Sequence, residues 1–129
     1  MKQKEIKVLM VEPGAYPRIT TLKNDLDSLQ KAVSIGADYQ GLIEIIGLEE
    51  GVCILCNEEG KLIGLEGNRR LGRDILTGVF YVVGEDGEGN LTSLPESMIE
   101  KYKQVFWTPQ VFSKNEIEAS IYTIFGSGW

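Results

Sequence analysis

The sequence predicts an α+β domain built on a mainly antiparallel sheet. Short apolar runs of β-type residues alternate with glycine-containing turns, and the segments with helical patterns follow strands without strictly alternating with them. We expect about five or six strands, with mixed pairing left open, and about two or three helices. No linker, repeat or low-complexity segment divides the chain, so residues 1–129 are expected to form a single domain.

The first elements are expected to be two strands and a helix. Residues 6–11 are apolar and rich in β-branched side chains, and residues 18–22 favour an extended segment that could pair with them. Asn24 is predicted to cap a helix over residues 25–34, in which apolar residues recur at helical spacing. Gly36 is expected to stop this helix.

The middle of the chain is typical of hairpins. Residues 42–48 and 52–56 are apolar runs on either side of a short connector that contains glycine. Residues 61–63 are expected to return as a brief strand. Residues 79–83 are apolar and aromatic throughout, as in a strand covered on both faces, and residues 85–90 are expected to form a polar turn.

Residues 64–73 are interpreted as an exposed functional loop, followed at residues 74–76 by barely one turn of helix. Three glycines surround Asn68, Arg69 and Arg70. Two planar, permanently charged guanidinium groups could bind a phosphate or carboxylate, with the asparagine as a neutral hydrogen-bonding partner. The alternative is structural: the asparagine takes a left-handed turn conformation, and one arginine ties the loop to a nearby acid or to backbone carbonyls.

Two more helices are predicted toward the carboxyl end. Ser93 and Glu96 fit a capping box, which precedes an apolar helical face. Ser113 and Glu116 fit a second one, although residues 117–125 would also suit a strand; we favour a helix. The residues of the first apolar face are Met98, Ile99, Tyr102, Val105 and Phe106.

Aromatic residues gather in the same part of the chain, where they could form a homodimer or partner surface. Trp129 follows a glycine-rich stretch and is hard to bury through local structure, so it is the strongest single indication of an added contact. The aromatic set is Tyr102, Phe106, Trp107, Tyr122, Phe125 and Trp129.

Composition and charge exclude several classes of function. With 43% hydrophobic and 25% charged residues, the chain has the composition of a folded globular protein. Nineteen acidic against thirteen basic residues give a net charge of -6, which argues against direct nucleic-acid binding. We find no secretory leader and no apolar stretch long enough to span a membrane, so a cytoplasmic protein without membrane association is expected.

Conventional catalytic and metal-binding patterns are also missing. The sequence has no histidine for a nucleophile triad, and the acidic pairs at 49–50 and 58–59 lie in predicted solvated turns. Cys53 and Cys56 have CxxC spacing, but residues three apart on a strand point to opposite faces, so we expect two inert core thiols. No catalytic residue, metal site or cofactor is predicted. An enzyme that uses only carboxylates or arginines stays open.

Several stretches together resemble a known family, the domain of unknown function 3846. The likeness lies in residues 8–14, 26–33, 56–62, 68–69, 74–80, 82–84, 92–94 and 100–102, in the expected order. It covers residues from about 6 to about 110, and the tail from about 111 to 129 departs from it. The resemblance implies an accessory protein of Gram-positive bacteria, their phages or their conjugative elements, and it implies no agreed activity.

The sequence therefore favours a non-enzymatic, protein-binding or regulatory accessory protein. Its partner would be contacted by Asn68, Arg69 and Arg70 in the loop and by Trp129, and a counter-defence inhibitor is the sharper version of this hypothesis. The alternative is a module, or minor enzyme, that binds a nucleotide or phosphate through Arg69 and Arg70.

Overall fold

The computed structural model describes residues 3–126, with side chains to residue 121, and its centre is a six-stranded antiparallel sheet. Five strands follow one another in the order β2-β1-β7-β4-β3, and β8 pairs with β7. The strands of this sheet are β1 Glu5–Val11, β2 Arg18–Lys23, β3 Ile43–Glu49, β4 Val52–Asn57, β7 Phe80–Glu85 and β8 Leu91–Thr92.

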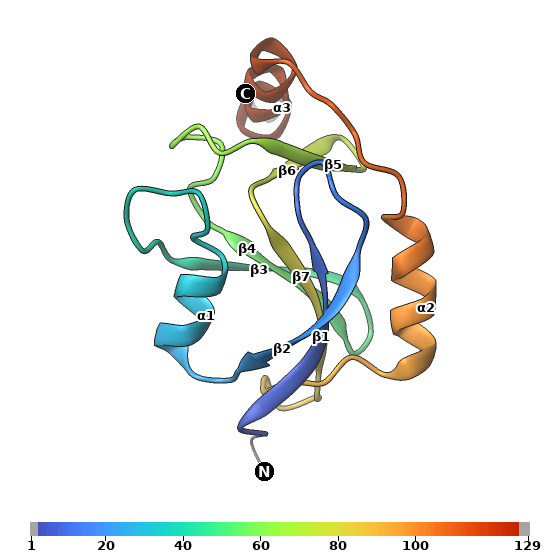
Figure 1. Ribbon diagram of the computed structural model, residues 1–129. Helices are drawn as coiled ribbons and strands as arrows, with labels where there is room; N and C mark the ends of the chain where they lie inside the picture. The colour runs from blue at the N-terminus through green and yellow to red at the C-terminus, as the bar shows by residue number, and fades with distance from the viewer. Residues whose placement is uncertain (1–2, 127–129) are drawn as a thin grey trace.

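A separate two-stranded sheet and three helices complete the domain. The small sheet is the hairpin of β5 (Gly67–Leu71) and β6 (Asp74–Thr77). Helices α1 (Leu26–Ala32) and α2 (Glu96–Val105) lie on opposite sides of the main sheet, whereas α3 (Lys114–Gly126) lies against the hairpin at one end (Figure 1). The predicted α+β class with an antiparallel sheet is confirmed.

The main sheet has an apolar core on each face. Strand β7 is buried along its length except at its last residue, as expected for a strand covered on both faces. One core lies under α2 and contains Leu9, Val11, Val52, Ile54, Cys56, Leu76, Phe80, Val82, Leu94, Ile99, Tyr102 and Phe106. The other lies under α1 and contains Ile6, Val8, Met10, Leu29, Val33, Cys53, Leu55, Val79, Tyr81 and Val83.

Much of the predicted pairing is confirmed. Strands β1 and β2 pair antiparallel, and β3 and β4 form the expected hairpin, from Ile43 opposite Asn57 to Gly47 opposite Cys53. The polar turn after β7 is closed by Asp86, whose carboxylate accepts three hydrogen bonds from the turn.

The segment between β4 and β7 differs from the prediction. Residues 61–63 are part of a turn and not a strand, with the Ile63 amide donating to the Glu59 carbonyl. The predicted loop at 64–73 contains β5, and the predicted helical turn at 74–76 is β6. A two-residue turn joins these strands, and Gly72 adopts φ +60° there, which favours a tight hairpin over a helix.

Two predicted helix caps are wrong, because the side chains serve tertiary contacts. The Asn24 amide donates to the carbonyls of Gln3 and Leu91, and Asp25 caps α1 by accepting from the Ser28 amide. The Ser93 hydroxyl accepts from the Lys7 amide, so α2 has no side-chain cap.

The helical expectations for the carboxyl end are otherwise mostly confirmed. Val105 is 58% exposed and thus lies off the buried face of α2. The capping box of Ser113 and Glu116 forms with both hydrogen bonds, and α3 follows it as predicted. Trp129 lies outside the described residues. Within the described residues, no helix is long and apolar enough to cross a membrane.

Candidate functional site

Strand β5 carries Asn68, Arg69 and Arg70, and it directs them to different environments. The β5–β6 register shifts between Gly67 and Arg69, so that Asn68 is the extra residue of a β-bulge. Such a bulge interrupts the alternation of side chains, which allows two successive residues to point inward. Asn68 and Arg69 are buried, at 0% and 2% exposure, whereas Arg70 is exposed. The expectation that all three lie on an exposed loop is wrong.

The Asn68 side chain joins β5 to two neighbouring segments. Its amide nitrogen donates to the carbonyl of Val11 at the end of β1, at 2.9 Å, and to that of Gly78 after β6, at 2.8 Å. Its amide oxygen accepts from Arg69 Nη1 at 2.8 Å. The donors and acceptor of this side chain are therefore used inside the protein.

The Arg69 guanidinium is held by oxygens that carry no formal charge. Nε donates to the Phe106 carbonyl at 2.9 Å, Nη2 donates to the Ala15 carbonyl at 2.6 Å, and Nη1 donates to Asn68. No carboxylate is among its partners within the described residues. Phe106 is the carboxyl-terminal cap of α2, where the helix dipole favours a cation. Burial lowers the pKa of Arg69, because desolvation disfavours the charged form.

Arg70 faces the opposite way and contacts the carboxyl-terminal part of the chain. Its side chain is 46% exposed, with Nη2 lying 3.8 Å from Glu116 Oε2 and the guanidinium 5.5 Å from the centre of the Phe112 ring. The Arg70 amide donates to Gln110 Oε1 at 2.6 Å. Because the two guanidinium groups point apart, they do not converge on one anion.

The two backbone carbonyls held by Arg69 each precede an exposed aromatic residue. Tyr16 follows Ala15, and Trp107 follows Phe106; their rings stack with centroids 4.6 Å apart and planes inclined by 29°. The tyrosine is 59% exposed and the tryptophan 46% exposed. We call these two rings the aromatic pair. Arg69 thus fixes the two points of backbone from which the aromatic pair projects.

Sequence reasoning placed Trp107 in its aromatic cluster and missed Tyr16. Nothing near Tyr16 in the sequence signals the stack, because the two residues come from the turn after β1 and from the end of α2. Two further exposed apolar residues, Val105 and Val111, flank the tryptophan along the chain. The exposed surface is therefore more apolar here than the charged composition of the chain suggests.

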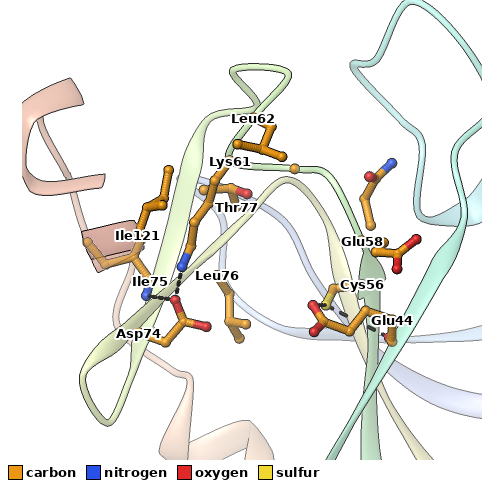
Figure 2. Close-up of a pocket in the computed structure, with 12 residues that line it drawn as sticks. Glu44, Cys56, Glu58, Lys61, Leu62, Asp74, Ile75, Leu76, Thr77 and Ile121 are labelled. Atoms are coloured by element: carbon orange, nitrogen blue, oxygen red, sulfur yellow. Dashed lines mark hydrogen bonds and ion pairs between the residues drawn. The ribbon is translucent and has the colours of Figure 1, made fainter. Parts of the chain in front are cut away.

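A small pocket between the main sheet and the β5–β6 hairpin is a second candidate (Figure 2). Its volume is about 150 Å³, whereas pockets for small-molecule ligands are typically about 300–1,000 Å³. Figure 2 shows the Lys61 ammonium directed at Asp74, with which it forms an ion pair, and Asp74 also accepts from the Ile75 amide at 2.7 Å. Lys61 and Asp74 therefore satisfy each other, which leaves the carboxylates of Glu44 and Glu58 as the other charged groups that line this small pocket.

The protein thiols are poorly suited to chemistry. Cys53 and Cys56 lie in different cores, on opposite faces of β4, which confirms that they cannot converge. Burial raises the pKa of Cys53 to about 11 and, together with the charge of Glu44, raises that of Cys56 to about 12. Neither forms an appreciable thiolate near neutral pH. The described residues contain no cluster of three or more side chains suited to metal binding.

Comparison with known families gives one match. The model of the family described as Domain of unknown function (DUF3846) matches residues 6–106 of the 129-residue chain. The chain belongs to this family. The searches of curated proteins and of solved structures gave no match.

The match places most of the fold inside the DUF3846 region. The six strands of the main sheet, the β5–β6 hairpin and both helices that cover the sheet lie within residues 6–106, apart from the first residue of β1. Trp107 follows directly after the matched region, and α3 lies beyond it. The aromatic pair therefore joins a residue of the DUF3846 region to the first residue after that region.

Proposed function

We propose that this DUF3846 protein is a non-enzymatic protein-binding module, and that the aromatic pair is the centre of its contact surface. The observation that carries the proposal is the stacking of two half-exposed rings, Tyr16 and Trp107, above a buried arginine that fixes both backbones. Tyrosine and tryptophan are enriched among the residues that dominate binding energy at protein interfaces. A surface that is already rigid also loses less conformational entropy on binding.

The partner would offer an apolar pocket for the rings and an acidic or polar rim. We expect the exposed Val105 and Val111, which are near Trp107 in the sequence, to extend the apolar contact. The exposed Arg70, whose backbone amide donates to Gln110, is expected to contact the rim. These roles replace the predicted ones: Arg69 positions the surface from inside, and of the two arginines only Arg70 is exposed enough to contact a partner. Trp129 stays a predicted contact.

The genetic setting implied by the family resemblance suggests the class of protein to which the partner belongs. An accessory protein of phages and conjugative elements would act on a host defence or transfer protein, and occupying such a protein would inhibit it. A counter-defence inhibitor is thus the sharper form of the proposal. It requires a stable, stoichiometric complex, whereas a weak regulatory contact does not.

Affinity capture from bacterial lysate, followed by mass spectrometry, tests this proposal. The double variant Tyr16→Ala/Trp107→Ala should lose the stoichiometric partner that the unaltered protein retains, because truncating an aromatic hot-spot residue costs about 2 kcal/mol or more. The matched control is Tyr39→Ala, an aromatic residue 52% exposed elsewhere on the surface. Circular dichroism should show that all three proteins are folded. Equal capture by the double variant and the control would contradict the proposal.

Binding of a small anion is less well supported. Arg69 is buried, and the remaining guanidinium of Arg70 lies near Glu116. A nucleotide or phosphate that bound the native state would raise the melting temperature saturably, following RT ln(1 + [L]/Kd). We expect no such shift across a panel of nucleotides and phosphates, and a saturable shift that disappears in Arg70→Ala would favour this alternative instead.

A further inference from the structure

The outer edge of β3 offers an open row of backbone hydrogen-bonding groups. This strand is the last in the order β2-β1-β7-β4-β3 and can be followed in Figure 1. Ile45 is 58% exposed, and a side chain added at Gly47 would meet nothing within 4 Å. An unprotected edge strand is a template for pairing with another strand.

The register with β4 shows which backbone groups point outward. The Glu58 amide donates to the Leu42 carbonyl, so residues 42 and 58 form a hydrogen-bonded pair of the antiparallel ladder. Such pairs alternate along the ladder. Glu44 and Ile46 therefore direct their backbone groups toward β4, opposite Cys56 and Ile54.

The intervening residues Ile43, Ile45 and Gly47 direct their amides and carbonyls away from the sheet. Within the described residues, no backbone partner lies on that side of β3. A register shift between Gly47 and Glu49 ends the regular ladder, so the open edge is the segment from residue 43 to residue 47. It offers three amides and three carbonyls to an added strand.

The sequence of this edge fits an antiparallel copy of itself. When two copies are placed about a twofold axis at Ile45, this residue faces its own copy and Ile43 faces Gly47. On the other face of the strand, Glu44 faces Ile46 and Leu42 faces Leu48. No two acidic residues face each other directly, and the exposed Ile45 and Leu42, at 58% and 57%, both gain an apolar neighbour.

We propose that the protein forms a homodimer in which the β3 strands of two copies pair antiparallel about Ile45, giving a continuous twelve-stranded sheet from the two six-stranded ones. The outward groups of residues 43, 45 and 47 then form six hydrogen bonds between the copies. The opposite edge strand, β2, is less suited to self-pairing, because Arg18 and Lys23 place positive charge at its two ends. This dimer does not involve the aromatic pair, because Tyr16 lies between β1 and β2, toward the opposite edge of the sheet from β3, and Trp107 follows α2.

The dimer is tested first by mass. Analytical ultracentrifugation between about 1 and 500 µM should show the mass rising from 14.3 kDa toward twice that value. In Ile45→Lys, like charges face each other at the axis. The protein concentration at which half of the chains are dimeric should therefore rise at least tenfold. The matched control Ile19→Lys, on β2 and 45% exposed, should behave as the unaltered protein. A constant monomer mass across this range overturns the proposal.

Cross-linking then tests the register. Residues of a hydrogen-bonded antiparallel pair have Cα atoms about 5.5 Å apart, so Ile45→Cys should be joined to its copy by a short bifunctional thiol reagent. The native thiols are buried and do not compete. Ile19→Cys serves as the control for random collision. Rapid dimer formation by the first variant alone supports the proposal; equal reaction of both variants, or none, contradicts it.

Discussion

Replacing Arg69 by alanine is the perturbation that most clearly separates a buried structural arginine from an exposed recognition residue. The change removes hydrogen bonds to Phe106, Ala15 and Asn68. Hydrogen bonds to a charged group contribute about 1.5–3 kcal/mol each, which gives an upper range of about 4.5–9 kcal/mol for three. The desolvation of the guanidinium, which the alanine variant avoids, offsets several kcal/mol of this.

The net loss in the free energy of unfolding is therefore expected to be about 3–5 kcal/mol, because each buried oxygen left without its donor costs about 1–3 kcal/mol. In urea unfolding, this corresponds to a midpoint lower by about 2 M for a slope of about 2 kcal/mol/M. Arg70→Ala is the matched control, since it removes an exposed arginine from the neighbouring position. Its ion pair with Glu116 spans 3.8 Å, and exposed pairs contribute about 0–1 kcal/mol.

The interior role of Arg69 is tested by comparing the loss in the free energy of unfolding between Arg69→Ala and Arg70→Ala. If Arg69→Ala and Arg70→Ala lower the free energy of unfolding equally, the interior role of Arg69 is refuted. Arg69→Lys is expected to lie between them, because a lysine keeps the charge but cannot reach three separate acceptors with the geometry of a guanidinium.

Two other predictions concern the core. Because burial raises the thiol pKa values of Cys53 and Cys56 from 9 to about 11 and about 12, the unfolded chain loses these protons first as the pH rises. The free energy of unfolding should therefore fall above pH 9, by up to about 1.4 kcal/mol per thiol at pH 10, and urea titrations of Cys53→Ala/Cys56→Ala should show a shallower fall. Gly84→Ala should lower the free energy of unfolding by about 1–3 kcal/mol, because its Cβ would lie 2.5 Å from the Ser93 carbonyl oxygen. Gly87→Ala, with open space around it, should be nearly neutral, and thermal melts of both variants measure the difference. Equal effects of the two changes would contradict the packing described.

The strands of the main sheet could be predicted because their signals are local. The runs that became β1, β4 and β7 are apolar over most of their length, as expected for strands that are largely buried on both faces. The β3–β4 hairpin was indicated by its glycine connector. Strand β8, of two residues, carries no comparable signal.

The candidate site was harder to predict, since its polar residues are buried by tertiary contacts. The sequence around Asn68 and Arg69 is polar and rich in glycine, which is typical of an exposed loop. Their burial depends on carbonyls supplied by β1, by the turn before β2 and by the end of α2. The structural alternative was right that an arginine holds backbone carbonyls, but it did not identify the distant segments that provide them. Its left-handed conformation for Asn68 is wrong, because this residue lies in β5 and does not have a positive φ.

Tertiary contacts also override the local sequence pattern at two of the predicted helix caps. Asn24 and Ser93 both lie in sequences suited to helix caps, yet each side chain hydrogen-bonds to backbone groups in or next to other strands instead. The box at Ser113 has no such competing contact and forms as predicted. A local pattern is therefore followed where the side chain has no stronger partner elsewhere in the fold.

The account depends most on the Arg69 side chain being sealed inside the protein while Arg70 is in water. Proton exchange at arginine Nε–H groups, measured by NMR on uniformly ¹⁵N-labelled protein near neutral pH, reports this directly. We predict one strongly protected Nε–H signal that vanishes in Arg69→Lys, since this donor is bonded to the Phe106 carbonyl, and rapid exchange for Arg70. Exchange at Arg69 as fast as at Arg70 would contradict the account.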